Sequence, residues 1–304
     1  MERVARHIVS VGGGKGGVGK SVVAANLAVA MAQEGHRVAL VDGDLGAANL
    51  HTLFGLTQPG PTLQDFVDHH LDSLEAARVE TGVRRLTLVR GANAVFGAAN
   101  PTHGSKQRLL RHVAALDADV VVIDVGAGTA FNQLDLFDLA DRRLVVLTPQ
   151  LTSVENAYGF VKAAVFRTLA PVLKAHGFDD VLDGPARSEA TKLPAFIAEV
   201  AACSPKLGAE LGEALQGFGL SLFGNLMHEP REAQVFQGVS RMMRDFLSLE
   251  VPVLGAARSM RAVHESVNHR RPVLVTHPQD ESSVVFRRVA NALLAAGVVT
   301  RRAA

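Results

Sequence analysis

The stretch VGGGKGGVGKSVV, residues 11–23, decides the fold of this 304-residue chain. Residues 14–21 match the pattern Gly-x-x-x-x-Gly-Lys-Ser; an apolar run precedes them, and a helical pattern that ends at Gln33 follows. In such a loop, glycine lets backbone N–H groups surround phosphate oxygens at the amino end of a helix. Lys20 would bridge the outer phosphates, and the Ser21 hydroxyl would bind Mg²⁺. The stretch therefore predicts a strand, a phosphate-binding loop and a helix that together bind a nucleotide.

The same loop contains a second lysine, Lys15, which the pattern does not require. Its ammonium group could neutralise charge on the transferred phosphoryl group, in its own site or in that of a neighbouring subunit. A solvent-exposed loop lysine is the alternative, and the spacing alone does not choose between them. The loop residues expected to contact the nucleotide are Gly14, Lys15, Gly16, Gly17, Val18, Gly19, Lys20, Ser21 and Val22.

Three carboxylates follow apolar runs that have the pattern of buried strands. Asp42 and Asp44 end the run VALVDGD, and Asp124 lies in VVVIDVGAG. An aspartate at the end of a buried strand is costly unless a cation meets it, and Mg²⁺ bound with a nucleotide meets that need. We expect Asp124 to bind the metal, Asp42 to support its water shell and Asp44 to orient the water that attacks the γ-phosphate. Any one of them alone could also be a helix cap or a turn residue.

Apolar runs alternate with helical patterns along most of the chain, and strands that are apolar on both faces belong to parallel sheets covered by helices. The predicted strands are residues 7–13, 37–42, 86–92, 119–126, 143–149, 220–227 and 251–257. The predicted helices span Lys20–Gln33, Ser105–Leu116 and Glu232–Leu247, and others start near Leu63 and Ser153. This alternation predicts an α/β fold, a doubly wound, mostly parallel sheet with helices on both faces, in a single domain over residues 1–304.

Residues 171–218 interrupt the alternation with two helical patterns in place of a direct return to a strand. Leu207, Leu211 and Leu215 recur every four residues, and Pro205 separates them from an earlier helical stretch. We expect a helical hairpin inserted in the domain, at the edge of the sheet away from the ligand site. A docking surface or structural brace, and a simple extension of the core, are the alternative roles.

Composition narrows the class of protein. A net charge of +1 with 48% hydrophobic residues favours a folded domain with a large core and offers no overall basic field for nucleic acid. Cys203 is the only cysteine, which excludes an internal disulfide and argues against a cysteine-ligated metal cluster. We expect no secretory leader in the residues before the first strand, and the apolar run near the start is too short to cross a membrane. We therefore expect a soluble, cytoplasmic protein.

The segment KGGVGKS with its early lysine resembles the deviant Walker A motif of the MinD/ParA family of dimerising ATPases. Similar segments extend over residues 10–56, 120–128, 147–158, 224–247 and 270–293. Within the family, the chain is most similar to the FlhG/FleN branch, the MinD-like regulators of flagellar number and placement. The resemblance implies ATP and Mg²⁺ as ligands, slow ATP hydrolysis, an ATP-dependent homodimer and a regulatory protein partner.

The resemblance also implies roles for single residues. Lys15 matches the signature lysine that reaches across a nucleotide-sandwich dimer to the phosphates of the partner subunit. Asp44 matches the switch aspartate that positions water, and Asp124 matches the Walker B aspartate. Asn225, at the end of its strand, matches an asparagine that reads the adenine ring.

Some features depart from the family pattern. Gln150 stands where many relatives have a glutamate, so a contact there across the dimer or to the ribose stays open. Asn49 falls where the family often has an asparagine, and we assign it no contact. MinD-like proteins often end in an amphipathic membrane helix, but the stripe Val285, Val289 and Leu293 has the pattern of a helix that covers the core. The inserted hairpin has no counterpart in typical members.

Three function hypotheses follow, and the third, a metabolic or cluster-handling enzyme on the same scaffold, has the single cysteine against an iron–sulfur carrier. In the first, ATP and Mg²⁺ close a homodimer that binds a regulatory protein, with recruitment to a membrane surface or cell pole as a further option, and hydrolysis opens it. The second is a ParA-type DNA-binding partition ATPase. It has less support because the paired arginines are scattered and aromatic residues make up only 5% of the chain. Strong, salt-dependent binding to duplex DNA would select the second hypothesis.

Overall fold

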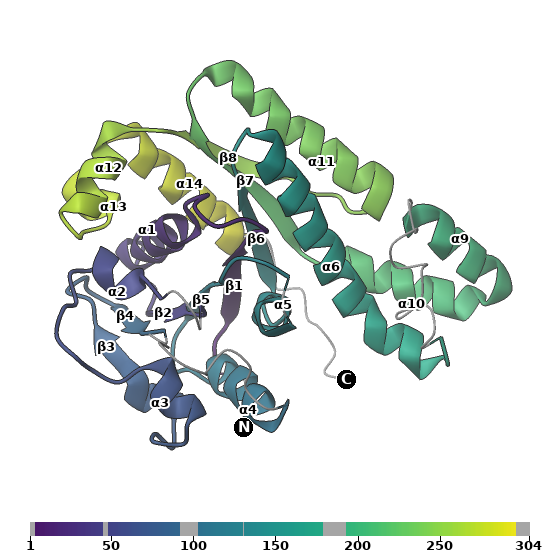
Figure 1. The fold of residues 1–304 in the computed structure, drawn as a ribbon, viewed down its shortest axis with the longest axis horizontal. Coiled ribbons are helices and arrows are strands. Elements are labelled where there is room, and N and C mark those ends of the chain that lie inside the picture. The colour runs from purple at the N-terminus through teal and green to yellow at the C-terminus, as the bar shows by residue number, and fades with distance from the viewer. Residues whose placement is uncertain (1–3, 45–47, 92–102, 130, 179–192, 296–304) are drawn as a thin grey trace.

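A computed structural model describes residues 4–44, 48–91, 103–129, 131–178 and 193–295. Within these ranges the strands form an eight-stranded sheet in the order β3-β4-β2-β5-β1-β6-β7-β8 (Figure 1). Their bounds are β1 (His7–Gly12), β2 (Val38–Asp42), β3 (Arg78–Glu80), β4 (Leu86–Val89), β5 (Val120–Asp124), β6 (Arg142–Leu147), β7 (Leu220–Met227) and β8 (Val253–Arg258). Neighbouring strands are parallel except for β3 and β4, which are antiparallel. The prediction of a doubly wound, mostly parallel sheet is therefore confirmed.

Helices follow most strands, as the sequence pattern predicts. The α-helices are α1 (Lys20–Gln33), α2 (Leu50–Leu53), α3 (Leu63–Val67), α4 (His103–Ala114), α5 (Phe131–Asp138), α6 (Leu151–Ala175), α9 (Leu193–Cys203), α10 (Pro205–Gln216), α11 (Ala233–Leu247), α12 (Arg261–Asn268), α13 (Val273–Thr276) and α14 (Glu281–Ala295). The described residues also form two short 3₁₀ turns, η1 (Leu74–Ala77) and η2 (Pro230–Glu232).

The helices form a layer on each face of the sheet, because side chains of its central strands alternate between two apolar cores. In β5, Val121 and Ile123 lie in the core that contains α4, α5, α6 and α11, whereas Val120 and Val122 lie in the core that contains α1 and α14. Figure 1 shows α1 and α14 together on one side of the strands and α5 and α6 on the other. This arrangement leaves the carboxyl ends of the parallel strands, and the loops that follow them, at one edge.

The edge of the sheet beside β4 differs from the sequence-based expectation. The helical pattern that starts at Leu63 forms only the five-residue α3, which begins with a capping box between Thr62 and Asp65. The chain then forms β3, which contains only Arg78, Val79 and Glu80. Three residues, two of them charged, are too few to produce a strand pattern, so this antiparallel edge strand was not predicted.

The inserted helical hairpin is present as α9 and α10, and residues 179–192 of the predicted insertion lie outside the described residues. Helix α6, which precedes it, continues through Pro171 to Ala175 and so ends later than the expected boundary. A Cβ on Gly208 would lie 2.5 Å from the Ala201 Cβ, so glycine at this position allows α10 to pack closely on α9. Helix α10 ends just before β7 begins, and therefore lies near the amino edge of the sheet.

Helix α14 covers the core, as its apolar stripe predicts. Val289 and Leu293 are buried in the same core as α1, and Val285 packs against it. The predicted tail TRRAA, residues 300–304, lies outside the described residues. Among the residues that the structure describes, no helix combines the length and the apolar character needed to cross a bilayer.

Candidate nucleotide-binding site

The predicted phosphate loop connects β1 to the amino end of α1, at the carboxyl edge of the sheet (Figure 1). Gly17 and Gly19 have φ angles of 78° and 90°, the left-handed region that favours glycine. A Cβ on Gly14 would lie 2.0 Å from the Asn156 carbonyl oxygen, and a Cβ on Gly19 would lie 2.4 Å from Asn225 Nδ2. The glycines are therefore needed both for the curvature of the loop and for its close packing between α6 and β7.

Lys20 begins α1 with its ammonium group directed into the loop. The residue is nine-tenths buried, and its Nζ donates to the Lys15 carbonyl oxygen at 3.2 Å. Burial lowers the pKa of Lys20, and the charges of Asp124 and Asp44 oppose that shift. A phosphate group beside this ammonium ion would offset the cost of its burial. Lys20 thus lies where the phosphate-loop pattern predicts it.

Asp42 and Asp124 lie opposite one another on the neighbouring strands β2 and β5. Burial, followed by the charge of Asp42, raises the pKa of Asp124 to about 8, against a hydrogen bond from Ser21 and the charge of Lys20. Burial also raises the pKa of Asp42 to about 6. Two buried carboxylates beside a single lysine leave this edge of the sheet short of positive charge.

The oxygen atoms at Asp124 suit magnesium. Mg²⁺ prefers hard oxygen ligands and usually keeps several waters. Asp124 Oδ1 is buried and accepts no hydrogen bond from any residue that the structure describes, and the Ser21 hydroxyl lies beside the same carboxylate. In the described part of the chain, no three His, Cys, Asp or Glu side chains could hold a metal ion by themselves. The residues therefore fit a Mg²⁺ ion that arrives with a nucleotide, whose phosphates would supply further oxygens.

Asp42 holds the loop that carries Asp44. Its Oδ1 accepts from the backbone N–H of Asp44 at 3.2 Å, and its Oδ2 accepts from the backbone N–H of Leu50 at 3.1 Å. A Cβ on Gly91 would lie 2.9 Å from the Asp42 carboxyl carbon, so glycine leaves room for this side chain. The predicted role of Asp42, support of the water shell of a metal ion, stays a prediction. The hydrogen bonds from the loop backbone to Asp42 were not predicted, because every residue type except proline has a backbone N–H group.

Asp44 lies beside the loop that follows β5. A Cβ on Gly126 would lie 3.1 Å from the Asp44 carboxyl carbon, and the backbone N–H of Gly43 donates to the Asp124 carbonyl oxygen at 2.8 Å. These contacts join the two carboxylate-bearing loops. The fold thus brings together four of the five charged side chains predicted for the phosphate and metal site: Lys20, Asp42, Asp44 and Asp124.

A cavity of about 210 Å³ adjoins the phosphate loop. Its wall includes Gly19, Val22, Asn225 and Phe286, together with residues of β8 and α12. The Asn225 side chain is buried, and its Nδ2 donates to the Val18 carbonyl oxygen at 2.9 Å. The same asparagine therefore contacts the loop and lines the cavity, and it is the residue that the family resemblance implies reads the adenine ring.

The Lys15 side chain contacts α6. Its Nζ donates to the hydroxyl of Thr152, the second residue of that helix, at 2.9 Å. Gln150 is exposed directly before α6, and Asn49 is exposed directly before α2. The contact between Lys15 and Thr152 was not predicted, because the two residues lie 137 positions apart in the sequence.

Comparisons with known proteins agree with this geometry. Residues 4–170 match the model of the ParA family, described as NUBPL iron-transfer P-loop NTPase. The antiactivator FleN of Pseudomonas aeruginosa is 25% identical over 286 residues, which cover 93% of this chain and 85% of FleN. The flagellum site-determining protein YlxH of Helicobacter pylori is 26% identical over 170 residues, 51% of this chain and 52% of YlxH. Among solved structures, the fold is similar to that of the septum site-determining protein MinD from Pyrococcus horikoshii OT3, which was solved with Mg-ADP. The TM-score is 0.66 at 20% identity, and the match covers 97% of this chain and 99% of the MinD chain.

Proposed function

Because this chain belongs to the MinD/ParA family of P-loop ATPases, we propose that it is an ATP-dependent dimerisation switch of the MinD/FlhG type. It would regulate the positioning or number of a cellular structure, such as flagella, through a partner protein. The observation that carries the proposal is the buried group of Lys20, Asp42 and Asp124 beside the phosphate loop, in which two carboxylates face one lysine. A nucleotide with its metal would supply the missing positive charge. The whole chain, residues 1–304, would act as a single P-loop ATPase domain.

The loop and the cavity would bind ATP together. Backbone N–H groups of the loop and the Lys20 ammonium group would hold the phosphates, and Asn225 with the 210 Å³ cavity would hold the base. The Asn225 side-chain oxygen can accept from an adenine amino group, while its Nδ2 donates to the loop. Ser21 and Asp124 would hold Mg²⁺, which when bound neutralises charge on the phosphates.

Hydrolysis would use Asp44 to orient a water toward the γ-phosphate. Asp44 lies beside Gly126, in the loop that follows Asp124, so a ligand that binds Asp124 also affects the surroundings of Asp44. Asp42 would keep Asp44 in place, because its carboxylate accepts from the backbone on both sides of residues 45–47. Proteins of this family hydrolyse ATP, and the same reaction is proposed here.

Dimerisation would place Lys15 in the site of a second copy. A cation supplied in trans can raise the rate of phosphoryl transfer by about 10³ to 10⁵. In the single chain the Lys15 ammonium group is bound to Thr152 on the outer surface of α6, which leaves Lys20 as the lysine directed into the loop. Lys15 would therefore leave Thr152 when the dimer closes.

The flagellar role rests on the similarity to FleN over nearly the whole chain and to YlxH over half of it. Proteins of the MinD family bind partner proteins, which supports a regulatory partner here. The family model names iron transfer, but Cys203 is the only cysteine of the sequence, and iron–sulfur clusters are held by several thiolates. Cluster transfer is therefore not part of the proposal.

The mass of the chain in solution tests the switch. We expect a monomer with Mg-ADP and a dimer with Mg²⁺ and a non-hydrolysable ATP analogue. Lys15→Ala should still bind ATP but lose dimerisation and turnover, whereas Lys206→Ala, whose side chain is 81% exposed on α10, should behave as wild type. Unchanged turnover in Lys15→Ala would refute the role of Lys15 in the partner's site.

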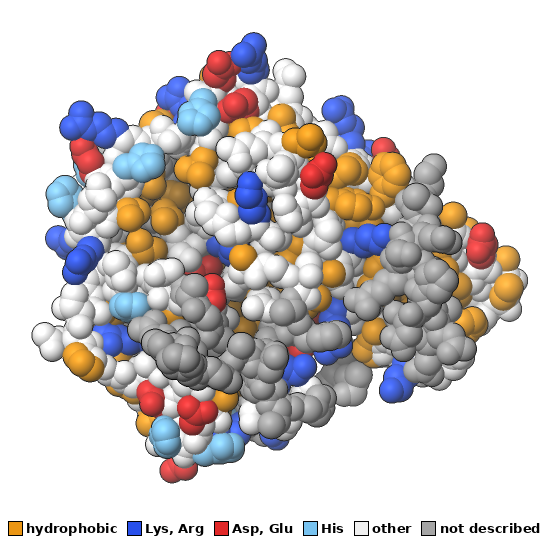
Figure 2. Space-filling view, viewed as in Figure 1, with side chains coloured by type: hydrophobic (Ala, Val, Ile, Leu, Met, Phe, Trp, Pro, Cys, Tyr) orange, Lys and Arg blue, Asp and Glu red, His pale blue; other side chains and the backbone are white. Residues whose placement is uncertain are grey.

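The same measurement with duplex DNA and with anionic vesicles separates the remaining roles. On the face seen in Figure 2, Lys and Arg side chains are spread among Asp and Glu side chains, which does not favour a DNA-binding surface. Tight, salt-dependent association of the ATP-bound form with DNA would favour the partition ATPase instead. Association with vesicles alone would support recruitment of the dimer to a membrane or cell pole.

A further inference from the structure

The phosphate loop and the amino end of α6 form a continuous surface. We call it the loop–helix face, and its exposed residues are Gly16, Gly17, Leu151, Thr152, Glu155 and Asn156. Leu151 is 72% exposed, more than any other large hydrophobic side chain of the described residues. A single exposed apolar side chain is common in soluble proteins, so its exposure alone carries no argument. What matters is that Leu151 directly precedes Thr152, which contacts the loop through Lys15.

Two contacts join the loop to α6. The Lys15 Nζ donates to the Thr152 hydroxyl at 2.9 Å, and the Gly14 backbone packs so closely on Asn156 that a Cβ would lie 2.0 Å from its carbonyl oxygen. Figure 1 shows the start of α6 beside the loop between β1 and α1. A macromolecule that binds the loop on the side of α6 would therefore also lie close to Leu151, the residue before Thr152.

The composition of the loop–helix face is that of an interface. Glu155, one turn after Leu151 on α6, is the charged residue among these six, and the Lys15 ammonium group held by Thr152 adds one positive charge. The other exposed residues of the face are uncharged. The surface helix α11, by contrast, exposes Arg241, Arg244 and Asp245. The buried centres of protein interfaces are depleted in charged residues, and their binding energy is concentrated in a few anchors surrounded by polar groups.

We infer that Leu151 is the apolar anchor with which a second copy of this chain binds the loop–helix face in the ATP-bound dimer. The inference rests on the proposed ATP-dependent dimer. If Lys15 of each copy enters the site of the other, a two-fold axis must pass between the two loops, and the same surface of both chains is buried. Leu151 directly precedes Thr152, the residue that holds Lys15, so both copies of Leu151 lie close to that axis.

Sedimentation velocity of the full chain, with Mg²⁺ and a non-hydrolysable ATP analogue, tests the anchor. Leu151→Asp should raise the dissociation constant of the dimer by about tenfold or more, because it places a carboxylate in each half of a self-complementary apolar contact. Leu151→Met should restore dimerisation. The control is Val4→Asp, just before β1 at the opposite edge of the sheet from the phosphate loop, where the wild-type valine is 51% exposed, and it should dimerise as wild type. Binding of a fluorescent ATP analogue to the monomer should be equal in all of these variants.

The outcomes separate the anchor from the switch itself. A wild-type chain that stays monomeric with the ATP analogue overturns both the proposed function and the anchor. A wild type that dimerises, together with a Leu151→Asp variant that dimerises equally well, overturns the anchor alone. Normal dimerisation of Leu151→Asp with loss of partner binding would assign the loop–helix face to another protein, and so would also overturn it.

Discussion

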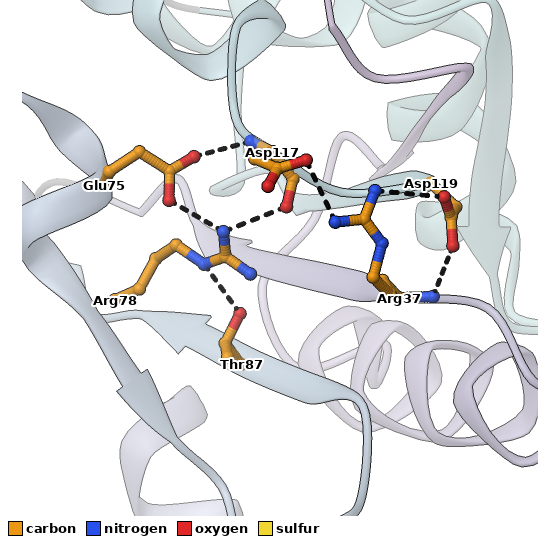
Figure 3. A network of polar contacts seen from close by, with 6 residues as sticks. All are labelled: Arg37, Glu75, Arg78, Thr87, Asp117 and Asp119. Carbon is orange, nitrogen blue, oxygen red and sulfur yellow. Dashed lines mark hydrogen bonds and ion pairs between the residues drawn. The ribbon is translucent and has the colours of Figure 1, made fainter.

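Charged side chains gather at both edges of the sheet, but the two clusters are built differently. At the amino ends of β2 and β5, arginines and carboxylates form the open network of Figure 3. Arg37 donates to Asp117 at 3.0 Å and to Asp119 at 3.3 Å. Arg78 donates to Glu75 at 2.7 Å. In this network each carboxylate has an arginine within the chain.

The carboxyl edge has the opposite balance. There Asp42 and Asp124 are buried, and burial raises the pKa of both. At the amino edge, by contrast, hydrogen bonds from the backbone and the side chain of Arg37 lower the pKa of Asp119. The positive charge of Lys20 lowers the pKa of Asp124, but burial and the charges of Asp42 and Asp44 outweigh it. Charges that are matched within the chain need no ligand, whereas buried charges left unmatched at a cost in stability point to a functional site.

The largest effect should come from Lys20, the cation of the carboxyl edge. Lys20→Ala removes the buried ammonium group proposed to bind the phosphates, so we expect ATP turnover to fall by at least about a hundredfold. Calorimetric titration with Mg-ATP should show a matching loss of affinity. Lys206→Ala, which removes an exposed lysine on α10, is the control. Equal losses of ATP turnover in the two variants would show that Lys20 has no special role at the carboxyl edge.

Asp44→Ala comes next, because it removes the group expected to orient the attacking water. Turnover should fall by about a hundredfold while ATP still binds, so that the dimer accumulates in the presence of ATP. Phosphate release and chain mass, measured on the same sample, check both statements. A variant that hydrolyses ATP at the normal rate would remove Asp44 from the mechanism.

The two edges should also differ in their dependence on pH. The pKa of Asp124 is raised in the folded chain, so its contribution to stability is greatest below its ordinary pKa of 3.8 and is lost as pH rises to about 8. The Asp124→Asn variant has no carboxyl group at this position, so it does not lose stability in this way as pH rises. In EDTA without nucleotide, we expect the free energy of unfolding of the variant at pH 8 to exceed that of the wild type by about 2 kcal/mol.

Urea unfolding of both proteins at pH 5 and pH 8 measures the difference, which should be smaller at pH 5. With Mg-ATP the order should reverse, because only the wild type gains from the bound metal. An identical pH dependence in both proteins would show that Asp124 is ionised in the folded chain at no cost, and the contrast between the edges would then be wrong.

The smallest effect is expected at the amino edge. Arg37→Ala breaks exposed ion pairs, which contribute little, so the melting temperature should fall by no more than about 2 °C and ATP turnover should not change. The pKa of Asp119 is lowered in the fold, so the small contribution of this pair is present near neutral pH and is lost as pH falls through the acid range. Thermal scans at pH 7 and pH 4 measure both. A loss of turnover in Arg37→Ala would mean that the two edges are coupled.

Most of the site was predictable because its residues are neighbours in sequence or end recognisable strands. The phosphate loop is one continuous segment, and Asp42, Asp124 and Asn225 each lie within or at the end of an apolar strand whose pattern is visible without a structure. The edge strand β3 was not predictable, because three residues carry too little periodicity. The bonds from Asp42 to its loop join a side chain to backbone groups, which every residue type has.

The sequence by itself determined the residue types of the candidate site: a glycine-rich loop, a lysine and a hydroxyl proposed to bind phosphate, and aspartates at the ends of buried strands. These properties depend on residue type and short spacing, which the chain carries locally. Only the tertiary structure decided what the unusual Lys15 contacts and which surface surrounds it. Thr152 and Leu151 lie far from the loop in sequence, and only the crossover from β6 to α6 places them beside it.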